Sequence, residues 1–255
     1  MHSIDLNADL GEAFGPWRMG DDEAMLKVVT SASIACGGHA GDPETMYKTT
    51  LLARKNNVLI GAHPGFPDKQ GFGRRRFPIT TQEIERVIAT QLGALMGAAA
   101  LADGKVSYVK PHGALANWAA EDRYVADAIV RAIRLVAPSL SVLAISGTEL
   151  ELAARKSNLA TYSEIFADRA YDSRGHLVSR QKPGAMISDK RQMVERLLRF
   201  FETQKMRTID GQDIELKADS ICIHGDTPDA VIAAKHLRCA LENAGLTIRA
   251  FMNSS

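Results

Sequence analysis

Short apolar runs alternate with longer amphipathic segments along most of the chain. A buried strand reads as a continuous apolar run, whereas a helix on the protein surface repeats its apolar positions every three to four residues. The pattern therefore predicts seven strands, at residues 3–6, 33–35, 58–62, 107–109, 141–145, 162–166 and 220–223. Seven helices are predicted between and after them, at residues 22–30, 43–56, 81–103, 120–137, 148–156, 190–205 and 228–244.

The short connections between these elements indicate parallel strands covered by helices. About seven strands in 255 residues favour a closed, seven-stranded (β/α) barrel, with an open doubly wound sheet as the alternative. An open dinucleotide-binding sheet would carry a GxGxxG motif after its first strand, and the sequence has none there. No Pro- or Ser-rich linker divides the chain, so we expect residues 1–255 to form a single α/β domain, a (β/α) barrel.

Four of the predicted strands lead into a histidine. SIACGGHAGD contains His39, VLIGAHPGF contains His63, SYVKPHGAL contains His112 and SICIHGDTPDA contains His224. In parallel α/β folds the carboxyl ends of all strands lie on one face, and active sites are built there from the loops that follow. We therefore expect the four rings to converge on one mouth, although any single ring could be an isolated loop histidine. The charged residues beside them are Asp9, Glu12, Asp42, Lys110 and Asp226.

The predicted first strand, IDLNADLGE, carries polar residues on one of its faces. Alternation places Asp5, Asn7 and Asp9 on one side and apolar residues on the other. A buried polar face is costly unless it lines a polar cavity. The D-x-N-x-D spacing is similar to the start of a calcium loop, but the required glycine comes one position late and Pro16 occupies the final ligand position. We therefore expect inward-pointing polar groups, with Asp9 and Glu12 near the mouth.

The stretches VKPHGALAN and EIFADRAY carry further candidates. An extended K-P-H sequence projects Lys110 and His112 to the same side, where a desolvated lysine could bind a carboxylate or phosphate or take part in proton transfer. Replacing Lys110 by Met, which removes the charge at similar volume, would then abolish activity with little loss of stability. Glu164 and Arg169 lie at the end of another predicted strand, and an arginine there suits bidentate capture of a carboxylate or phosphate.

Composition narrows the functional classes. The net charge is +1, so no strong field favours nucleic acid or an anionic membrane. Arg74, Arg75 and Arg76 form a basic cluster that is too short for a nucleic-acid arm and is typical of a solvated loop. No apolar run reaches the roughly 18–20 residues that a membrane span needs, and the N-terminus shows no secretory signal.

The cysteines favour a reducing compartment. Cys36, Cys222 and Cys239 are an odd number without CxxC spacing, which argues against a disulfide scaffold and against a structural zinc site. We therefore expect a cytoplasmic protein. Cys36 could act as a nucleophile paired with a histidine, but a small buried apolar residue at a strand end is the more common role.

Several familiar catalytic motifs are absent from the sequence. It has no GxxxxGK[ST] phosphate loop, no GxSxG nucleophile elbow and no HExxH zinc motif. The many histidines and carboxylates leave a divalent metal open, because two or three His with an Asp suit zinc or manganese. The candidate metal ligands are His39, His63, His112, His224 and Asp226.

Seven stretches together resemble one known family. IDLNADLGE, IACGGHAGD, GAHPGFPD, GFGRR, VKPHGAL, EIFADRAY and CIHGD, in this order, are similar to the motifs of the LamB/YcsF family. The resemblance covers essentially the whole chain. It implies a (β/α) barrel similar to polysaccharide-deacetylase-like barrels. It also implies the role of an A subunit in a bacterial ATP-dependent 5-oxoprolinase, which cleaves 5-oxoproline to glutamate together with B and C subunits.

The implied reaction needs groups that bind anions and groups that move protons. A five-membered lactam is an unreactive amide, and ATP can activate its carbonyl oxygen as a phosphate ester that water then attacks. Lys110 and Arg169 supply cations. The groups expected to act in catalysis are Asp9, Glu12, His39, His63, Lys110, His112 and Asp226. We expect ATP with Mg²⁺ as cofactor, and binding of substrate or phosphate by Asn7, Asp42, Glu164, Arg169 and His224.

Two positions depart from the family's motifs and leave the substrate open. Gly38 replaces the aromatic residue of IACGFHAG, and Ala116 replaces the tyrosine of KPHGALYN. Either Phe14, Trp17 or Trp118 refills the space, or water enters, or the pocket admits a lactam larger than 5-oxoproline.

Two alternatives to the implied function stay open, and so does homo-oligomerisation. One is a metal-dependent, deacetylase-like hydrolase of a C–N bond. The other is a non-catalytic subunit that senses a ligand.

Overall fold

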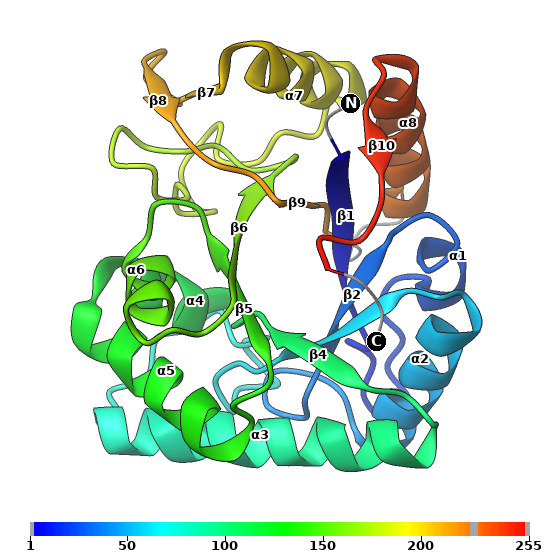
Figure 1. Ribbon diagram of the computed structural model, residues 1–255, viewed down its shortest axis with the longest axis vertical. Coiled ribbons are helices and arrows are strands. Elements are labelled where there is room, and N and C mark those ends of the chain that lie inside the picture. Colours follow the sequence, from blue (N-terminus) through cyan, green and yellow to red (C-terminus); the bar gives the residue numbers. More distant parts are fainter. Residues whose placement is uncertain (1–2, 225–228, 253–255) are drawn as a thin grey trace.

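Seven parallel strands close into a barrel in the computed structural model, which describes residues 3–224 and 229–252 (Figure 1). Their order around the barrel is β1-β2-β3-β4-β5-β6-β9, and β9 pairs back onto β1. The predicted seven-stranded (β/α) barrel is thereby confirmed, and the open sheet is excluded. The strands are β1 Ser3–Leu10, β2 Ser31–Ala35, β3 Leu59–His63, β4 Val106–Val109, β5 Ser141–Ile145, β6 Thr161–Phe166 and β9 Ser220–Cys222.

Strand β1 has two partners on its closing side. Its first residues pair with the short strand β10 (Thr247–Ile248), with Ser3 opposite Thr247. Its middle then pairs with β9, with Asp5 opposite Ser220. The closing strand β9 therefore meets β1 at residues 5–7, after the segment that pairs with β10.

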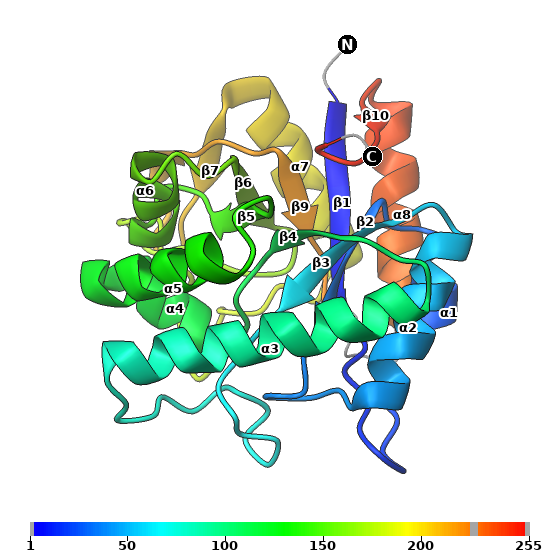
Figure 2. The ribbon, with the colours of Figure 1, turned by 60° about the horizontal axis from the view of Figure 1, so that its bottom comes forward.

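Helices surround the strands on the outside of the barrel (Figures 1 and 2). Figure 2 shows the long helix α3 crossing beneath β3 and β4, between α2 and α5. The helices in the described part of the chain are α1 Asp22–Met25, α2 Pro43–Lys55, α3 Thr81–Leu101, α4 Gly113–Glu121, α5 Arg123–Val136, α6 Glu149–Lys156, α7 Lys190–Thr203 and α8 Ala230–Asn243.

Local capping chemistry sets several helix boundaries. At α3 the Thr80 hydroxyl accepts from the Glu83 amide while the Glu83 carboxylate accepts from the Thr80 amide, a reciprocal capping box. The segment predicted as one helix over residues 120–137 begins earlier and is split into α4 and α5. Asp122 separates them because it has an extended backbone, and its carboxylate accepts from the Tyr124 and Val125 amides.

Other predicted boundaries also differ from the structure. The helix predicted over residues 22–30 is only the single turn α1, and β1 continues to Leu10 instead of ending at residue 6. The antiparallel hairpin of β7 (Lys205–Arg207) and β8 (Asp213–Glu215) was not predicted, because each strand has only three residues and both are mostly exposed. The predicted start of the last helix falls on residues outside the described ones.

Helix α3 is the one helix in the described ranges that is long and apolar enough to cross a membrane by length and composition. Its buried side chains include Ile84, Ile88, Leu92 and Leu95, spaced three or four residues apart. This stripe belongs to the main hydrophobic core. Packing against the barrel therefore accounts for the apolar character of α3.

The interior of the barrel is polar along β1. Asp5, Asn7 and Asp9 point inward, and apolar residues between them pack outward in the core, as the period-two pattern predicts. The Asp5 carboxylate accepts from Thr30 Oγ1 at 2.6 Å, from Ser31 Oγ at 2.7 Å and from Ser220 Oγ. Complete burial nevertheless raises the pKa of Asp5 to about 6, because these hydroxyls only partly replace water around the anion.

Asp5 should therefore make folding less favourable as the pH rises. In the unfolded chain an aspartate titrates near pH 3.9, whereas Asp5 in the folded protein titrates near pH 6. Between about pH 4 and pH 6 the unfolded state therefore loses its proton more readily, and the free energy of unfolding falls as the pH rises. Above about pH 6 both states are ionised, and the contribution of Asp5 to the free energy of unfolding stays constant. Asp5→Asn cannot ionise. We expect the free energy of unfolding of the wild type to fall relative to that of Asp5→Asn by on the order of 3 kcal/mol between pH 4 and 7. Urea unfolding at each pH measures this difference.

The exposed Asp210→Asn is the matched control, and its offset from the wild type should not change with pH in this way. A constant offset for Asp5→Asn as well would contradict the assignment.

Candidate functional site

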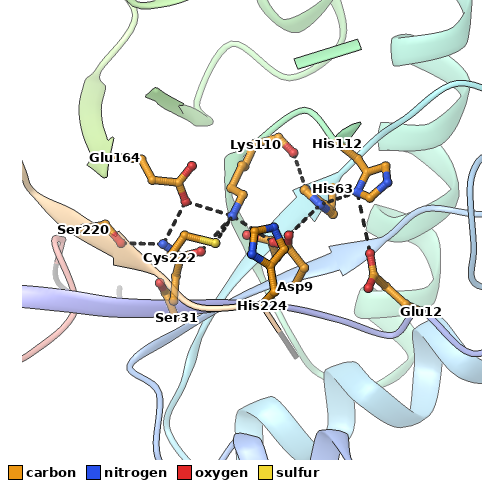
Figure 3. A network of polar contacts seen from close by, with 12 residues as sticks. Asp9, Glu12, Ser31, His63, Lys110, His112, Glu164, Ser220, Cys222 and His224 are labelled. Atoms are coloured by element: carbon orange, nitrogen blue, oxygen red, sulfur yellow. Dashed lines mark hydrogen bonds and ion pairs between the residues drawn. The ribbon is translucent and has the colours of Figure 1, made fainter. Parts of the chain in front are cut away.

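A buried lysine lies at the centre of the site (Figure 3). Lys110 directly follows β4 and is 3% exposed. Its Nζ is 2.8 Å from Asp9 Oδ1 and 2.8 Å from Glu164 Oε1, and it donates to Asn7 Oδ1 at 2.9 Å. It also lies 3.1 Å from the sulfur of Cys222. Strands β1, β4, β6 and β9 thus meet at one ammonium group.

The two carboxylates keep this lysine charged. Burial alone would lower the pKa of Lys110, but Asp9 and Glu164 outweigh it and hold that pKa well above its usual value. Burial would likewise raise the pKa of Asp9, but His63 and Lys110 outweigh it and hold that pKa well below its usual value. The network is therefore a lysine cation between two buried carboxylates.

Asn7 links this network to the polar residues deeper in the barrel. Its amide nitrogen donates to Glu164 Oε1 at 3.0 Å and to Ser220 Oγ at 2.7 Å. The Ser220 hydroxyl in turn donates to Asp5. Polar contacts consequently continue from the interior of the barrel to its mouth.

Three histidines and a glutamate form a second buried group beside the lysine. His63 Nε2 lies 3.0 Å from His112 Nδ1 and 3.3 Å from Asp9 Oδ2. His39 stacks on His112 with ring centroids 3.6 Å apart, and its Nε2 lies 3.1 Å from Glu12 Oε1. Burial, together with the neighbouring rings, lowers the pKa values of His39 and His112 well below the usual range. We call Glu12, His39, His63 and His112 the His/Glu cluster, and these four groups could hold a metal ion.

A third group, around His224, lies beside the lysine network, because His224 converges with Asp9 and Cys222 (Figure 3). Its Nδ1 lies 2.7 Å from Asp168 Oδ2, and its Nε2 lies 2.8 Å from Arg180 Nη2. A guanidinium can only donate, so Nε2 accepts and the ring carries its proton on Nδ1 toward Asp168. Burial alone would lower the pKa of His224, but Asp168 outweighs it and raises that pKa above the ordinary value.

Arg169 adds a buried cation with an unused donor. Its Nη2 donates to the Val178 carbonyl at 2.7 Å, while its buried Nε has no hydrogen-bond partner among the described residues. Burial and the nearby Arg180 lower its pKa to about 10, so the guanidinium stays protonated at neutral pH. A buried cation with a free donor is a binding element for an anion.

The three groups border one pocket of about 490 Å³, within the size range of small-ligand sites. Of the predicted site residues, those that line this pocket are Asp9, His63, Lys110, His112, Glu164, Arg169 and His224. Glu12 and His39 lie behind His112, and Asn7 lies below Lys110. Asp226 falls outside the described residues.

Asp42 has a different role from the one expected. It does not line the pocket. It is the N-cap of α2, where its carboxylate accepts from the Thr45 amide at 2.8 Å and from the Gly15 amide at 2.8 Å. The D-P dipeptide that opens α2 accounts for this side chain, so its assignment to substrate or phosphate binding is corrected.

The site also contains residues that the sequence patterns did not single out. Asp168 stands directly before Arg169, but a lone aspartate in a loop gives no signal of its histidine partner. Arg180 comes from the long irregular segment after β6, which has no periodic pattern. Arg74 lines the pocket, although its basic cluster is typical of a solvated loop. Of the other two arginines of that cluster, Arg75 pairs with Asp68 and Arg76 stacks on the Trp118 ring.

The two departures from the family motifs have different consequences. A Cβ at Gly38 would collide with the Gln91 side chain, which is buried and bonds to the Gly65 backbone through both of its amide atoms. Gln91 on α3 therefore occupies this space, and not one of the aromatic residues named above. Ala116 lines the pocket, so the size of the side chain at this position bears directly on the space for a substrate.

Cys36 is not an activated nucleophile. Burial raises its pKa to about 12, and its thiol donates to the Ile34 carbonyl at 3.2 Å. The role of a small buried residue, preferred from the sequence, fits this geometry.

A closed (β/α) barrel with buried ion pairs and a cationic pocket at its mouth defines an enzyme-like site of the α/β-barrel class. The chain belongs to the LamB/YcsF family, whose model matches residues 4–255. It is 51% identical over 249 residues to the A subunit of 5-oxoprolinase from Rhodopseudomonas palustris, covering 97% of this chain and 98% of the relative. It is 48% identical to an A subunit of 5-oxoprolinase from Pseudomonas syringae pv. tomato, covering 98% of each chain.

Two solved structures share the barrel fold of this chain. The lactam utilization protein from Thermus thermophilus superimposes with a TM-score of 0.90 at 39% identity, covering 97% of this chain and 99% of that one. A family 4 carbohydrate esterase from Streptomyces lividans matches with a TM-score of 0.50 at 9% identity, covering 97% of this chain and 91% of that one. The second likeness extends to the barrel fold alone.

The ion pairs around Lys110 change the expectation for Lys110→Met. The substitution leaves Asp9 and Glu164 as unbalanced buried carboxylates, so we now expect a loss of about 3–5 kcal/mol in the free energy of unfolding. The double variant Lys110→Met with Glu164→Gln removes one of the orphaned charges and should recover part of this loss. Urea unfolding of the single and double variants measures the coupling.

Lys105→Met replaces an exposed lysine ahead of the same strand and should change stability by less than about 0.5 kcal/mol. If Lys110→Met is as stable as this control, Lys110 acts only on the substrate and the structural role is wrong.

Proposed function

We propose that this chain is the A subunit of an ATP-dependent 5-oxoprolinase, which hydrolyses 5-oxoproline (pyroglutamate) to L-glutamate with B and C subunits. The names of the relatives and of the solved lactam utilization protein support the substrate class. The single observation that carries the proposal is the pocket at the mouth. Its lining contains both a buried cation with a free donor, Arg169, and the ion network of Lys110.

The pocket suits a small lactam that carries a carboxylate. 5-Oxoproline has one anionic group and one neutral cyclic amide. Arg169 and Arg180 line the pocket, and a carboxylate or a transferred phosphate would gain charge-assisted hydrogen bonds from them. Lys110 and its two carboxylates line the same pocket, and the amide would be held beside these groups, which can take or give protons.

Proton transfer falls most naturally to His224. Its Nε2 faces the pocket wall as an acceptor, and Asp168 holds the other nitrogen and makes the ring a stronger base. Arg180 donates to this acceptor nitrogen, so a substrate has to displace that contact before Nε2 can take a proton. In the proposed route ATP transfers its γ-phosphoryl group to the lactam oxygen and leaves as ADP. One water then attacks the activated carbon, and the ring C–N bond breaks to give an amine and an acyl phosphate. A second water hydrolyses the acyl phosphate to glutamate and free phosphate.

The cofactor and compartment follow from the same proposal. ATP with Mg²⁺ supplies the phosphoryl group, and the sequence has no GxxxxGK[ST] loop to bind it in the usual way. Because this chain lacks that loop, we assign part of the reaction to the partner subunits. The three cysteines are free in the structure, in keeping with the reducing cytoplasm.

A reconstitution assay tests the proposal. The isolated chain should show little ATP hydrolysis in response to 5-oxoproline, whereas the chain with its B and C subunits should release phosphate and glutamate together. His224→Gln should lower kcat of the assembled enzyme by about 10²-fold or more, because it removes the proposed proton acceptor. Coupled detection of phosphate and glutamate measures both products.

His236→Gln is the matched control, since His236 is exposed on α8 and should leave kcat unchanged. Full activity of the chain alone would contradict the need for partners. Amide hydrolysis without ATP, on an N-acetylated sugar for example, would instead favour the deacetylase-like alternative. Unaltered kcat in His224→Gln would remove that residue from the mechanism.

A further inference from the structure

The His/Glu cluster contains two imidazole nitrogens that face each other. His63 Nδ1 lies 2.6 Å from the Lys110 carbonyl oxygen, and His112 Nε2 lies 2.8 Å from the Phe72 carbonyl oxygen. A carbonyl oxygen only accepts, so each of these nitrogens carries a proton. In the neutral rings the remaining nitrogens, His63 Nε2 and His112 Nδ1, therefore present lone pairs to each other at 3.0 Å.

Two facing lone pairs in a buried site repel unless a cation lies with them. Nearby carboxylate oxygens also favour a positive charge at this place. Glu12 Oε1 lies 3.6 Å from His112 Nδ1 and 3.1 Å from His39 Nε2, and Asp9 Oδ2 lies 3.3 Å from His63 Nε2. Every one of these side chains is buried. The cluster thus offers oxygen and nitrogen donors that converge in a space nearly closed to water.

The backbone holds the two rings in this arrangement. The carbonyls of Lys110 and Phe72 fix which nitrogen of each ring is protonated, as outer partners do for metal-bound histidines. Phe72 has a φ of 53°, a left-handed conformation that a bulky residue seldom adopts. Such a conformation is typical of a functional constraint at a binding site.

We propose that Glu12, His63 and His112 form a binding site for one divalent transition-metal ion. His39, whose ring stacks on His112, does not bind the ion in this arrangement but contacts the Glu12 carboxylate. An ion about 2.1 Å from two nitrogens that are 3.0 Å apart would see them at about 90°, which suits neighbouring positions of an octahedral or five-coordinate ion. Imidazole with carboxylate suits zinc, iron or nickel more than magnesium. The proposal concerns binding by this chain and does not depend on the proposed function.

The other possible donor group at the mouth is less suitable. Asp9, Cys222 and His224 also converge. However, burial raises the pKa of Cys222 well above its usual value, so the sulfur is a thiol and not the thiolate that binds metals. The Lys110 ammonium lies 3.1 Å from that sulfur and would repel an ion there. The His/Glu cluster is therefore the group assigned.

At this position a bound ion would act as a Lewis acid at the edge of the pocket, next to His63, His112 and Asp9. The residues themselves orient the ion and exclude water from it.

Metal binding by the isolated chain tests the proposal directly. His236 and Cys239 are exposed three residues apart on α8 and could bind a metal adventitiously, so the background is His236→Gln with Cys239→Ser. Chelator-treated protein of this background is titrated with Co²⁺ and followed by visible absorption. We expect one Co²⁺ per chain, displaced by Zn²⁺. Glu12→Gln, nearly equal in size, should weaken binding by about 10–100-fold.

A second measurement distinguishes a metal ion bound between His63 and His112 from a single proton shared by the two rings. In ¹⁵N-histidine NMR we expect His63 protonated on Nδ1 and His112 protonated on Nε2, and added Zn²⁺ should shift the two facing nitrogens. If the His236→Gln, Cys239→Ser protein does not bind Co²⁺ at all, the exposed pair on α8 accounts for any binding by the wild type, and the proposal is overturned. Zn²⁺-independent spectra showing one proton between the rings would also overturn it, because this proton alone would then balance the lone pairs.

Discussion

The pairing of one buried ammonium with two buried carboxylates is the constraint on which this molecule depends. Lys110 follows β4, Asp9 lies on β1 and Glu164 lies on β6, so the three charges meet only when the barrel is closed. Removing one partner of a buried ion pair typically costs about 3–5 kcal/mol, because the other charge stays in a medium that solvates it poorly. Closure of the barrel and assembly of the site are therefore the same event.

The ion network also divides the mouth into two chemically different sides. On one side, loops after β2, β3 and β4 bring together imidazoles whose pKa values are low enough to keep His39 and His112 neutral. On the other side, residues after β6 and β9 contribute Arg169, Arg180 and the His224–Asp168 pair. One side suits a metal ion and the other an anion.

The barrel and much of its mouth could be predicted because each depends on local patterns. The histidines and Lys110 come at the ends of short apolar runs, and parallel topology then brings those ends together. Contacts made from irregular segments could not be predicted in this way. Arg180 reaches His224 across 44 positions of sequence, and Asp168 has no neighbour that marks it. Gln91 fills the space beside Gly38 from a helix whose pattern predicts only burial.

The central claim is that this pocket binds a lactam through its carboxylate, and calorimetric titration of the chain tests it most directly. The account predicts that 5-oxoproline binds, that 2-pyrrolidinone, which lacks the carboxylate, does not, and that Arg169→Gln weakens binding by about tenfold or more. Arg174→Gln, at an exposed arginine paired with Asp172, should bind as the wild type does. Equal binding of both lactams, or undiminished binding by Arg169→Gln, would contradict the account.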